Sequence, residues 1–363
     1  MLRNGERSAS VYGMLTYKGL STKPVAFRSM TGLSVEEFQS LLGRVRPHYE
    51  ALVARRMYRP ERRRGPGGGL KSRHDLTERL LMTLVWLRLY VACDALGAMF
   101  EVDKSTASRF TRPILQILRE LGEDTLGWPK EARELVEPEE SSPKDAREDS
   151  GEGSGGERGG DDQGAPPETT VEATVEATVV TPDRSTCPDH LAIVDATEQR
   201  VERSSTYAVQ KRYYSGKKKC HTIKTQVIVN ERGRIRHVSD SVPGSTHDLT
   251  LLRESSLKAE LPVGLTVTGD TGYRGLQNDF PEHSVALPYR PKSKQVLMPE
   301  EKLHNHLVSK VRIVVENTLC ELKHFRALSS VFRHSLERYN QITRAIVGIV
   351  NWRFDKRTAE VPA

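Results

Sequence analysis

The chain has 363 residues, of which 37% are hydrophobic and 28% are charged, and its formal net charge at pH 7 is +7. This length suits two or three domains, and the excess of Lys and Arg predicts an anionic partner. The most apolar stretch, 80–100, contains Arg88 and Asp94, and residues 1–28 lack the apolar core of a secretory signal, so we expect a cytoplasmic protein without a membrane span.

The charges fall into three blocks. Residues 1–136 hold 23 basic and 15 acidic side chains, residues 137–180 hold 3 and 13, and residues 181–363 hold 29 and 20. The acidic block contains no aromatic residue and is rich in Gly, Pro and Ser, so it cannot bury enough apolar surface to offset the entropy of ordering. We therefore predict a helical domain over 1–136, an acidic disordered linker over 137–187 and a second domain over 188–356.

Helix signals begin at Asp75, an acceptor that precedes Glu78 by three residues and is followed by apolar residues at helical spacing. A short second helix is expected over 93–100. Asp103 predicts the cap of a third helix over 104–111. Pro113 is expected to start a further helix that ends near Gly122.

This helix, turn and short polar helix are typical of a helix-turn-helix. Its last helix would enter the major groove of DNA with Ser105, Thr106 and Arg109 nearest the bases. The alternative is an ordinary three-helix bundle. An upstream arginine run that includes Arg63 and Arg64 lies beside a glycine stretch and suits an arm that contacts phosphates. With DNA as the partner, the acidic linker is either a solvated spacer or a decoy that competes with DNA.

The C-terminal part alternates strand and helix signals. Strands are predicted over 191–195, 265–270 and 284–289, a hairpin over 225–230 and 234–241, and helices over 245–255 and 299–325. The first two single strands end in Asp195 and Asp270. The long helix carries Arg312, Glu316 and Lys323 on nearly the same face. The expected fold is a mixed α/β sheet.

Acidic side chains at two strand ends, together with Glu316, predict a site for hard divalent cations such as Mg²⁺. Two such ions can activate a nucleophile and stabilise the leaving oxygen of a phosphodiester. Asp248 and His247 are accessory candidates. For Asp248 the alternative is a capping box that begins at Ser245, and for His247 it is a local hydrogen bond.

A second basic segment lacks any acid between residues 203 and 230, and tyrosines are interleaved with its cations. It is a candidate DNA-phosphate surface with stacking groups, and the alternative is a solubilising hairpin edge. Its cations are Lys211, Arg212, Lys217, Lys218, Lys219 and Lys224.

Four motifs in order resemble the DDE transposases of bacterial insertion sequences, in particular the group related to PIF/Harbinger elements. These motifs are Val194-Asp-Ala-Thr197, Pro243-Gly-Ser-Thr-His-Asp248, Gly269-Asp-Thr-Gly-Tyr273, and Arg312-Ile-Val-Val-Glu316 with Lys323. Residues 75–112 resemble the helix-turn-helix that precedes the nuclease domain in that group.

The resemblance implies an α/β RNase H-like catalytic domain, a mixed sheet with flanking helices, behind an N-terminal all-α helix-turn-helix domain. It implies that Asp195, Asp270 and Glu316 are the catalytic and metal-binding triad, with two Mg²⁺ ions that Mn²⁺ can replace. Arg312 and Lys323 would contact DNA.

The expected function is binding of inverted-repeat ends, followed by DNA cleavage and strand transfer by a homo-oligomer, a dimer on paired ends, in the bacterial nucleoid. Two alternatives remain, a domesticated DNA-binding protein that no longer cuts and a nuclease without joining activity. The helical stripe at Ile342, Ala345, Ile346, Ile349 and Val350 is expected to be a packing face or a dimer contact.

Overall fold

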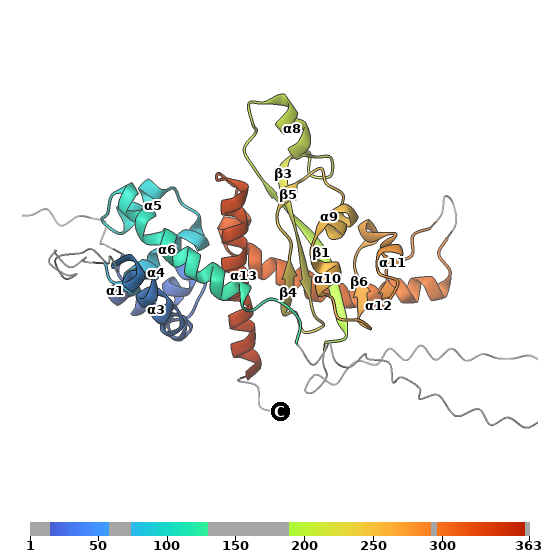
Figure 1. Cartoon of the computed structure of the whole chain (residues 1–363), viewed down its shortest axis with the longest axis horizontal. Coiled ribbons are helices and arrows are strands. Elements are labelled where there is room, and N and C mark those ends of the chain that lie inside the picture. Colours follow the sequence, from blue (N-terminus) through green and yellow to red (C-terminus); the bar gives the residue numbers. More distant parts are fainter. Residues whose placement is uncertain (1–14, 58–73, 130–188, 292–295, 360–363) are drawn as a thin grey trace, which may run out of the picture.

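A computed structural model describes residues 15–57, 74–129, 189–291 and 296–359. The predicted linker over 137–187, together with Arg63 and Arg64, lies outside these ranges. Figure 1 shows a helical part beside a sheet with flanking helices, and the long C-terminal helix lies between the two. No helix in the described ranges is both long and apolar enough to cross a bilayer.

The helical part confirms the helix starts predicted at Asp75, near Cys93 and at Asp103. Its helices are α1 (Tyr17–Ser21), α2 (Pro24–Thr31), α3 (Val35–Met57), α4 (Leu76–Leu89), α5 (Cys93–Met99) and α6 (Lys104–Glu123). The Asp75 carboxylate caps α4 by accepting the Glu78 N–H at 3.0 Å, and the Asp103 carboxylate caps α6 by accepting the Thr106 N–H at 2.9 Å. The Glu78 carboxylate accepts the Tyr17 N–H at 3.0 Å, which joins α1 to α4.

The expectation that Pro113 starts a new helix is wrong, because α6 continues through Pro113 to Glu123. An internal proline removes one backbone hydrogen bond and costs about 3 kcal/mol. The buried face of α6, which includes Ile114 and Leu118, packs against α4 and the C-terminal helix α13 (Leu336–Ala359) and offsets that cost.

The C-terminal part contains the expected mixed sheet. Its strands are β1 (Leu191–Arg200), β2 (Tyr214–Ser215), β3 (Cys220–Val229), β4 (Ile235–Val238), β5 (Val242–Pro243), β6 (Thr266–Thr268) and β7 (Ser284–Ala286). Their order is β2-β3-β1-β6-β7, with β4 and β5 paired to β3. The pairs β1–β6 and β6–β7 are parallel and β1–β3 is antiparallel, the arrangement of an RNase H-like sheet.

Several short helical segments and one long helix, α12, accompany the strands. They are α8 (Tyr207–Tyr213), α9 (Asp248–Glu254), α10 (Leu257–Glu260), the 3-10 helix η1 (Thr271–Tyr273), α11 (Leu276–Asp279), α12 (Pro299–Lys323) and the 3-10 helix η2 (Arg326–Leu328). The β3–β4 pairing confirms the predicted hairpin, and α12 begins at Pro299 as predicted. Figure 1 shows α8 at the tip of an arm that extends β1 and β3 beyond the sheet.

Both faces of the sheet are buried, and successive side chains of β1 point to opposite faces. Ile193 faces a core shared with α12, α13 and the N-terminal helices, whereas Ala192 and Val194 face a second core formed with α9, α10 and α11. One core is thus continuous between the helical part and the sheet. The predicted domain boundaries remain a prediction.

Helices α6 and α13 cross where two glycines meet. A Cβ on Gly348 would lie 2.4 Å from the Gly122 Cα, and a Cβ on Gly122 would lie 2.2 Å from the Arg344 carbonyl oxygen. The predicted apolar stripe of α13, which includes Ile342 and Ile346, is buried in this core. It is therefore a packing face within the chain.

Candidate active site and nucleic-acid interface

Asp195 and Asp270 lie side by side because their strands are parallel and in register. The last register pair between β1 and β6 is Ile193 with Thr268, and each aspartate follows two residues later. The prediction that the first strand ends at Asp195 is wrong, because β1 continues to Arg200; Asp195 lies within β1, just past the point where its parallel pairing with β6 stops. The predicted juxtaposition of these two acids is therefore present in the fold.

A third aspartate joins them around Tyr273. The Tyr273 hydroxyl accepts a hydrogen bond from Gln226 Nε2 at 2.9 Å, and the ring is buried. Burial raises the Tyr273 pKa well above its ordinary value, and the negative charges of Asp248, Asp195 and Asp270 raise it further. The charges of all three carboxylates therefore act on the same buried phenol.

Gly272 keeps the space between two of these carboxylates open. A Cβ at this position would lie 2.8 Å from Asp270 Oδ1 and 3.0 Å from Asp248 Oδ2. The Gly272 N–H also donates to Asp270 Oδ1 at 2.7 Å and fixes that carboxylate after β6.

Asp195 is a partly desolvated carboxylate on β1. Burial raises its pKa above 3.8, and the charges of Asp270 and Asp248 raise it further, whereas the Ala196 N–H and the Arg312 guanidinium lower it. The Ala196 N–H donates to Asp195 Oδ1 at 2.8 Å. A desolvated carboxylate of this kind is stabilised by a cation placed beside it.

Glu316 lies on α12, which packs against β1 and β3. Arg312 Nη2 is 3.7 Å from Glu316 Oε1, and the Glu316 side chain is 56% exposed. The positive charge of Arg312 also lowers the Asp195 pKa, so Arg312 interacts electrostatically with both Asp195 and Glu316. Within the described ranges, no three acidic, His or Cys side chains come close enough to share one cation. In this structure Glu316 is connected to Asp195 through Arg312.

Asp248 has a different role from the predicted capping box. The cap of α9 is His247, whose ring nitrogen accepts the Leu249 N–H at 3.3 Å, and the Ser245 hydroxyl instead donates to the Arg212 carbonyl. The capping-box alternative for Asp248 is therefore wrong, and the local role for His247 is confirmed.

The partner of Asp248 is Lys224, which the sequence placed on an exposed surface. Lys224 Nζ is 2.7 Å from Asp248 Oδ1 and 3.7 Å from Glu198 Oε1, and its side chain is only 9% exposed. It also donates to the Thr246 carbonyl at 2.6 Å. Residue 224 faces inward because it pairs with Glu198 across β1 and β3. Its assignment to the DNA surface is wrong.

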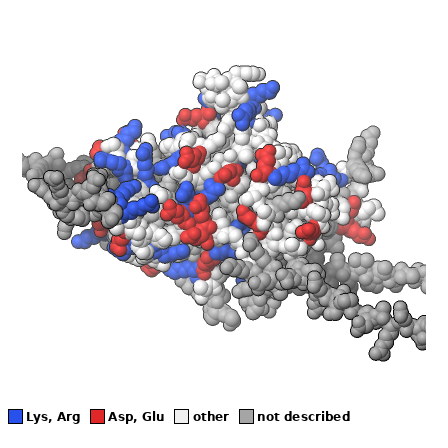
Figure 2. All heavy atoms as spheres, in the orientation of Figure 1, with Lys and Arg blue, Asp and Glu red and all other residues white. Residues whose placement is uncertain are grey.

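The other cations of that segment lie on the arm around α8. Lys211, Arg212, Lys217, Lys218 and Lys219 are all exposed. Tyr207 and Tyr214 are 78% and 44% exposed beside them. On the face drawn in Figure 2, Lys and Arg lie beside this arm and over the helical part. Exposed cations and tyrosines are compatible both with a DNA-phosphate surface and with a solubilising hairpin edge, so both interpretations of the segment stay open.

In the helix-turn-helix, the predicted base-reading side chains surround the Asp103 cap. The Thr106 hydroxyl donates to Asp103 Oδ2 at 2.7 Å and accepts from Arg109 Nη2 at 2.9 Å, and the Ser105 hydroxyl donates to Asp103 Oδ1 at 2.5 Å. Ser105 and Arg109 are exposed and Thr106 is half-buried. Arg109 is thus held in place on the solvent side of α6.

Sequence reasoning missed the structural roles of Gln226 and Tyr273 and the inward orientation of Lys224. The register of β1 with β3 was the signal for Lys224, since it places a lysine opposite Glu198. Lys323 lies exposed at the end of α12.

Comparison with known proteins agrees with this geometry. Residues 194–351 match the family model described as DDE superfamily endonuclease, and residues 75–124 match the helix-turn-helix of DDE superfamily endonuclease. The chain is 32% identical over 165 residues to a probable transposase for insertion sequence element IS702 from Microchaete diplosiphon, a match that covers 45% of this chain. It spans 57% of that relative's length.

No solved structure is significantly similar to the chain. The family models name the superfamily, and the narrower PIF/Harbinger group stays a prediction. The two models match the chain in the order in which the helix-turn-helix and the sheet occur in the structure. The RNase H-like part of the chain is thus similar to DDE superfamily endonucleases, and the helical part ahead of it is similar to the helix-turn-helix of those endonucleases.

Proposed function

We propose that this protein is a transposase that binds the inverted-repeat ends of a mobile element and catalyses DNA cleavage and strand transfer, as a dimer on paired ends. The observation that carries the proposal is the register of β1 with β6, which sets Asp195 beside Asp270, with Glu316 linked to them through Arg312. The similarity to a probable transposase for an insertion sequence supports it.

Asp195, Asp270 and Glu316 would hold two Mg²⁺ ions, or Mn²⁺ in their place. The donors fit such ions, since hard divalent cations prefer carboxylate oxygens. The space beside Gly272, which a Cβ would fill, faces Asp270 and Asp248. When bound, two such ions supply positive charge that favours attack by an oxygen nucleophile on a phosphodiester and stabilises the departing oxygen.

The remaining residues orient the acids and hold DNA. Arg312 places a positive charge between Asp195 and Glu316. Lys224 fixes one oxygen of Asp248 and so sets the direction of the third aspartate. Arg109 on α6 and the cations around α8 would contact the DNA, whose phosphates suit exposed Lys and Arg.

The test is a cleavage assay with the full chain and DNA that carries the flanks of its own gene, in Mg²⁺ or in EDTA. We expect nicking at a defined boundary in Mg²⁺, and joined products when target DNA is added. Glu316→Gln should abolish both while DNA binding stays within about twofold. The matched control is Glu300→Gln, an exposed acid in the first turn of the same helix, which should cut normally.

Each failure has a distinct meaning. Cleavage without joined products would identify a nuclease without joining activity. Tight binding without cleavage would identify a DNA-binding protein derived from a transposase. Loss of DNA binding in Glu316→Gln would show that Glu316 has a structural role and would remove it from the proposed triad.

A further inference from the structure

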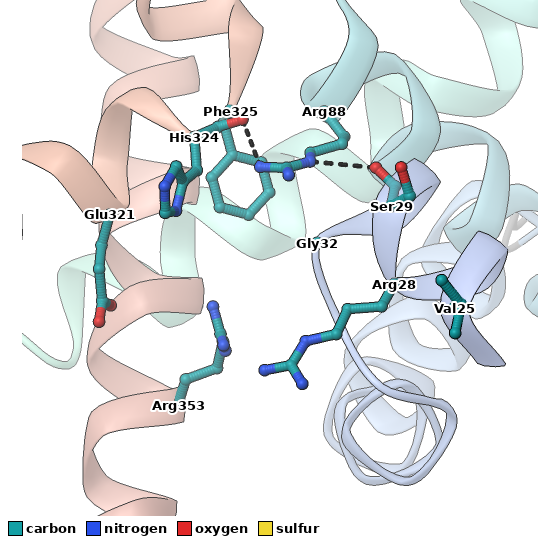
Figure 3. Close-up of a pocket in the computed structure, with 9 residues that line it drawn as sticks. All are labelled: Val25, Arg28, Ser29, Gly32, Arg88, Glu321, His324, Phe325 and Arg353. Atoms are coloured by element: carbon teal, nitrogen blue, oxygen red, sulfur yellow. Dashed lines mark hydrogen bonds between the residues drawn. The ribbon is translucent and has the colours of Figure 1, made fainter.

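A basic pocket lies between the helical part and the catalytic part, away from the aspartates. It has a volume of about 480 Å³ and is formed by α2 and α4 on one side and by the C-terminal ends of α12 and α13 on the other. Its lining includes Arg28, Arg88, His324, Phe325 and Arg353. Figure 3 shows the Arg28 and Arg353 guanidinium groups extending into the same space.

The positive charge of this pocket exceeds its negative charge. The Arg353 Nε is 3.2 Å from Glu37 Oε1, and Glu321, the acid in the lining, is 3.2 Å from Arg357 Nη2. Both acids near the pocket therefore already have a cation.

Arg88 and Arg28 have no such compensation. Arg88 donates to the Ser29 and His324 carbonyl oxygens, which are neutral acceptors. In the described part of the chain, the Arg28 guanidinium has neither an ion pair nor a hydrogen-bond partner. These two guanidinium groups are available to an anion.

The electrostatic environment of Arg88 agrees with an excess of positive charge in the pocket. Burial lowers the Arg88 pKa, and the positive charges of Arg326 and Arg353 lower it further. Like charges held together in a half-buried space repel one another, and an anion between them relieves that repulsion. Guanidinium groups bind phosphate through paired N–H donors, so phosphate is the anion that this pocket fits best.

The position of the pocket indicates which phosphate group it would bind. His324 is the residue that follows α12, and Glu316 lies eight residues earlier on that helix. At 1.5 Å per residue the separation along the helix is about 12 Å, a distance that a DNA strand covers in a few nucleotides. Arg88 comes from α4, the first helix matched to the helix-turn-helix. One phosphate here would contact both parts of the protein.

We propose that this pocket is a phosphate-binding site that holds a backbone phosphate of bound DNA, a few nucleotides from the phosphodiester that is cut. The phosphate chemistry stands on the pocket alone, and DNA as its source rests on the proposed function. Inorganic phosphate shares the chemistry and serves as the first probe.

The first experiment titrates the full chain with inorganic phosphate at constant ionic strength and follows thermal unfolding. A ligand that binds only the folded state raises its stability in a saturable way. Arg28→Gln should weaken the apparent phosphate affinity about tenfold, the equivalent of one charged hydrogen-bonded contact. Arg28 is exposed, so the variant should fold normally. The matched control is Lys23→Gln, which removes an exposed cation just before α2 and outside the pocket.

The second experiment measures binding of end DNA between 50 and 200 mM salt. Loss of one phosphate contact should reduce the salt slope by about 0.9 in Arg28→Gln and leave it unchanged in Lys23→Gln. Both results together would support the proposal. Equal phosphate affinity in the two variants would overturn the site. Phosphate binding that depends on Arg28 with an unchanged salt slope would overturn DNA as the source. Phosphate binding that depends on Arg28 in a chain that cuts no DNA would keep the pocket and refute the proposed function.

Discussion

Replacing Lys224 with Met tests the buried ion pairs beside the aspartates. Lys224 is 2.7 Å from Asp248 and 3.7 Å from Glu198, and the side chains of these two acids are 21% and 7% exposed. Removing one partner of a buried ion pair costs about 3–5 kcal/mol. The Thr222 hydroxyl still donates to Glu198 at 2.7 Å, and Asp248 can recover part of its hydration, so we expect the lower end, about 3 kcal/mol.

The assay is chemical unfolding at pH 7, with the free energy of unfolding taken from the transition. Lys211→Met, which removes an exposed lysine on α8, is the control and should change stability by less than about 0.5 kcal/mol. Combining Lys224→Met with Asp248→Asn should cost less than the sum of the single changes, because the two residues contact each other. A cost below about 1 kcal/mol for Lys224→Met would refute the assignment of Lys224 as a buried ionic bridge.

Three further changes test other parts of the structure. Burial raises the pKa of Asp195 above 3.8, so its charged form opposes folding. Asp195→Asn should therefore increase the free energy of unfolding of the metal-free protein at pH 7. This gain should vanish as the pH falls below 3.8, where the carboxyl is protonated in both the folded and the unfolded states. A gain that grows toward low pH would contradict this. Gly348→Ala should cost about 1–3 kcal/mol in thermal unfolding, because its Cβ would lie 2.4 Å from Gly122, whereas Gly43→Ala has open space and should stabilise α3 by up to about 1 kcal/mol. Arg109→Ala should weaken binding to end DNA by about 1–3 kcal/mol in a mobility-shift assay; an equal loss on scrambled DNA would indicate a contact with phosphate alone.

Local signals in the sequence predicted most of the fold. Asp75 and Asp103 cap helices as expected, and the predicted strands that carry Asp195 and lead to Asp270 lie next to each other in the sheet, although the first of them runs on to Arg200. These features depend on neighbouring residues: a cap requires an acceptor three positions before its partner, and a buried strand requires a short apolar run. The proximity of the two aspartates could therefore be predicted from the sequence.

Features that depend on distant partners could not be predicted in this way. Pro113 ends a helix by local rules, but the packing of α6 on α13 keeps the helix continuous. Lys224 belongs to a cationic run, yet its register with Glu198 turns it inward. The basic pocket combines Arg28, Arg88 and Arg353, which come from three helices far apart in the sequence.

The central claim is that Asp195, Asp270 and Glu316 form one metal-dependent centre for DNA cleavage. The most direct measurement compares cleavage by the wild type and by Asp270→Cys in Mg²⁺ and in Mn²⁺, with DNA binding measured in parallel. A thiolate is a poor ligand for Mg²⁺ and a better one for softer ions, so the variant should bind DNA, fail to cut in Mg²⁺ and regain part of its cleavage in Mn²⁺. Cleavage by Asp270→Cys at the wild-type rate in Mg²⁺ would contradict the claim.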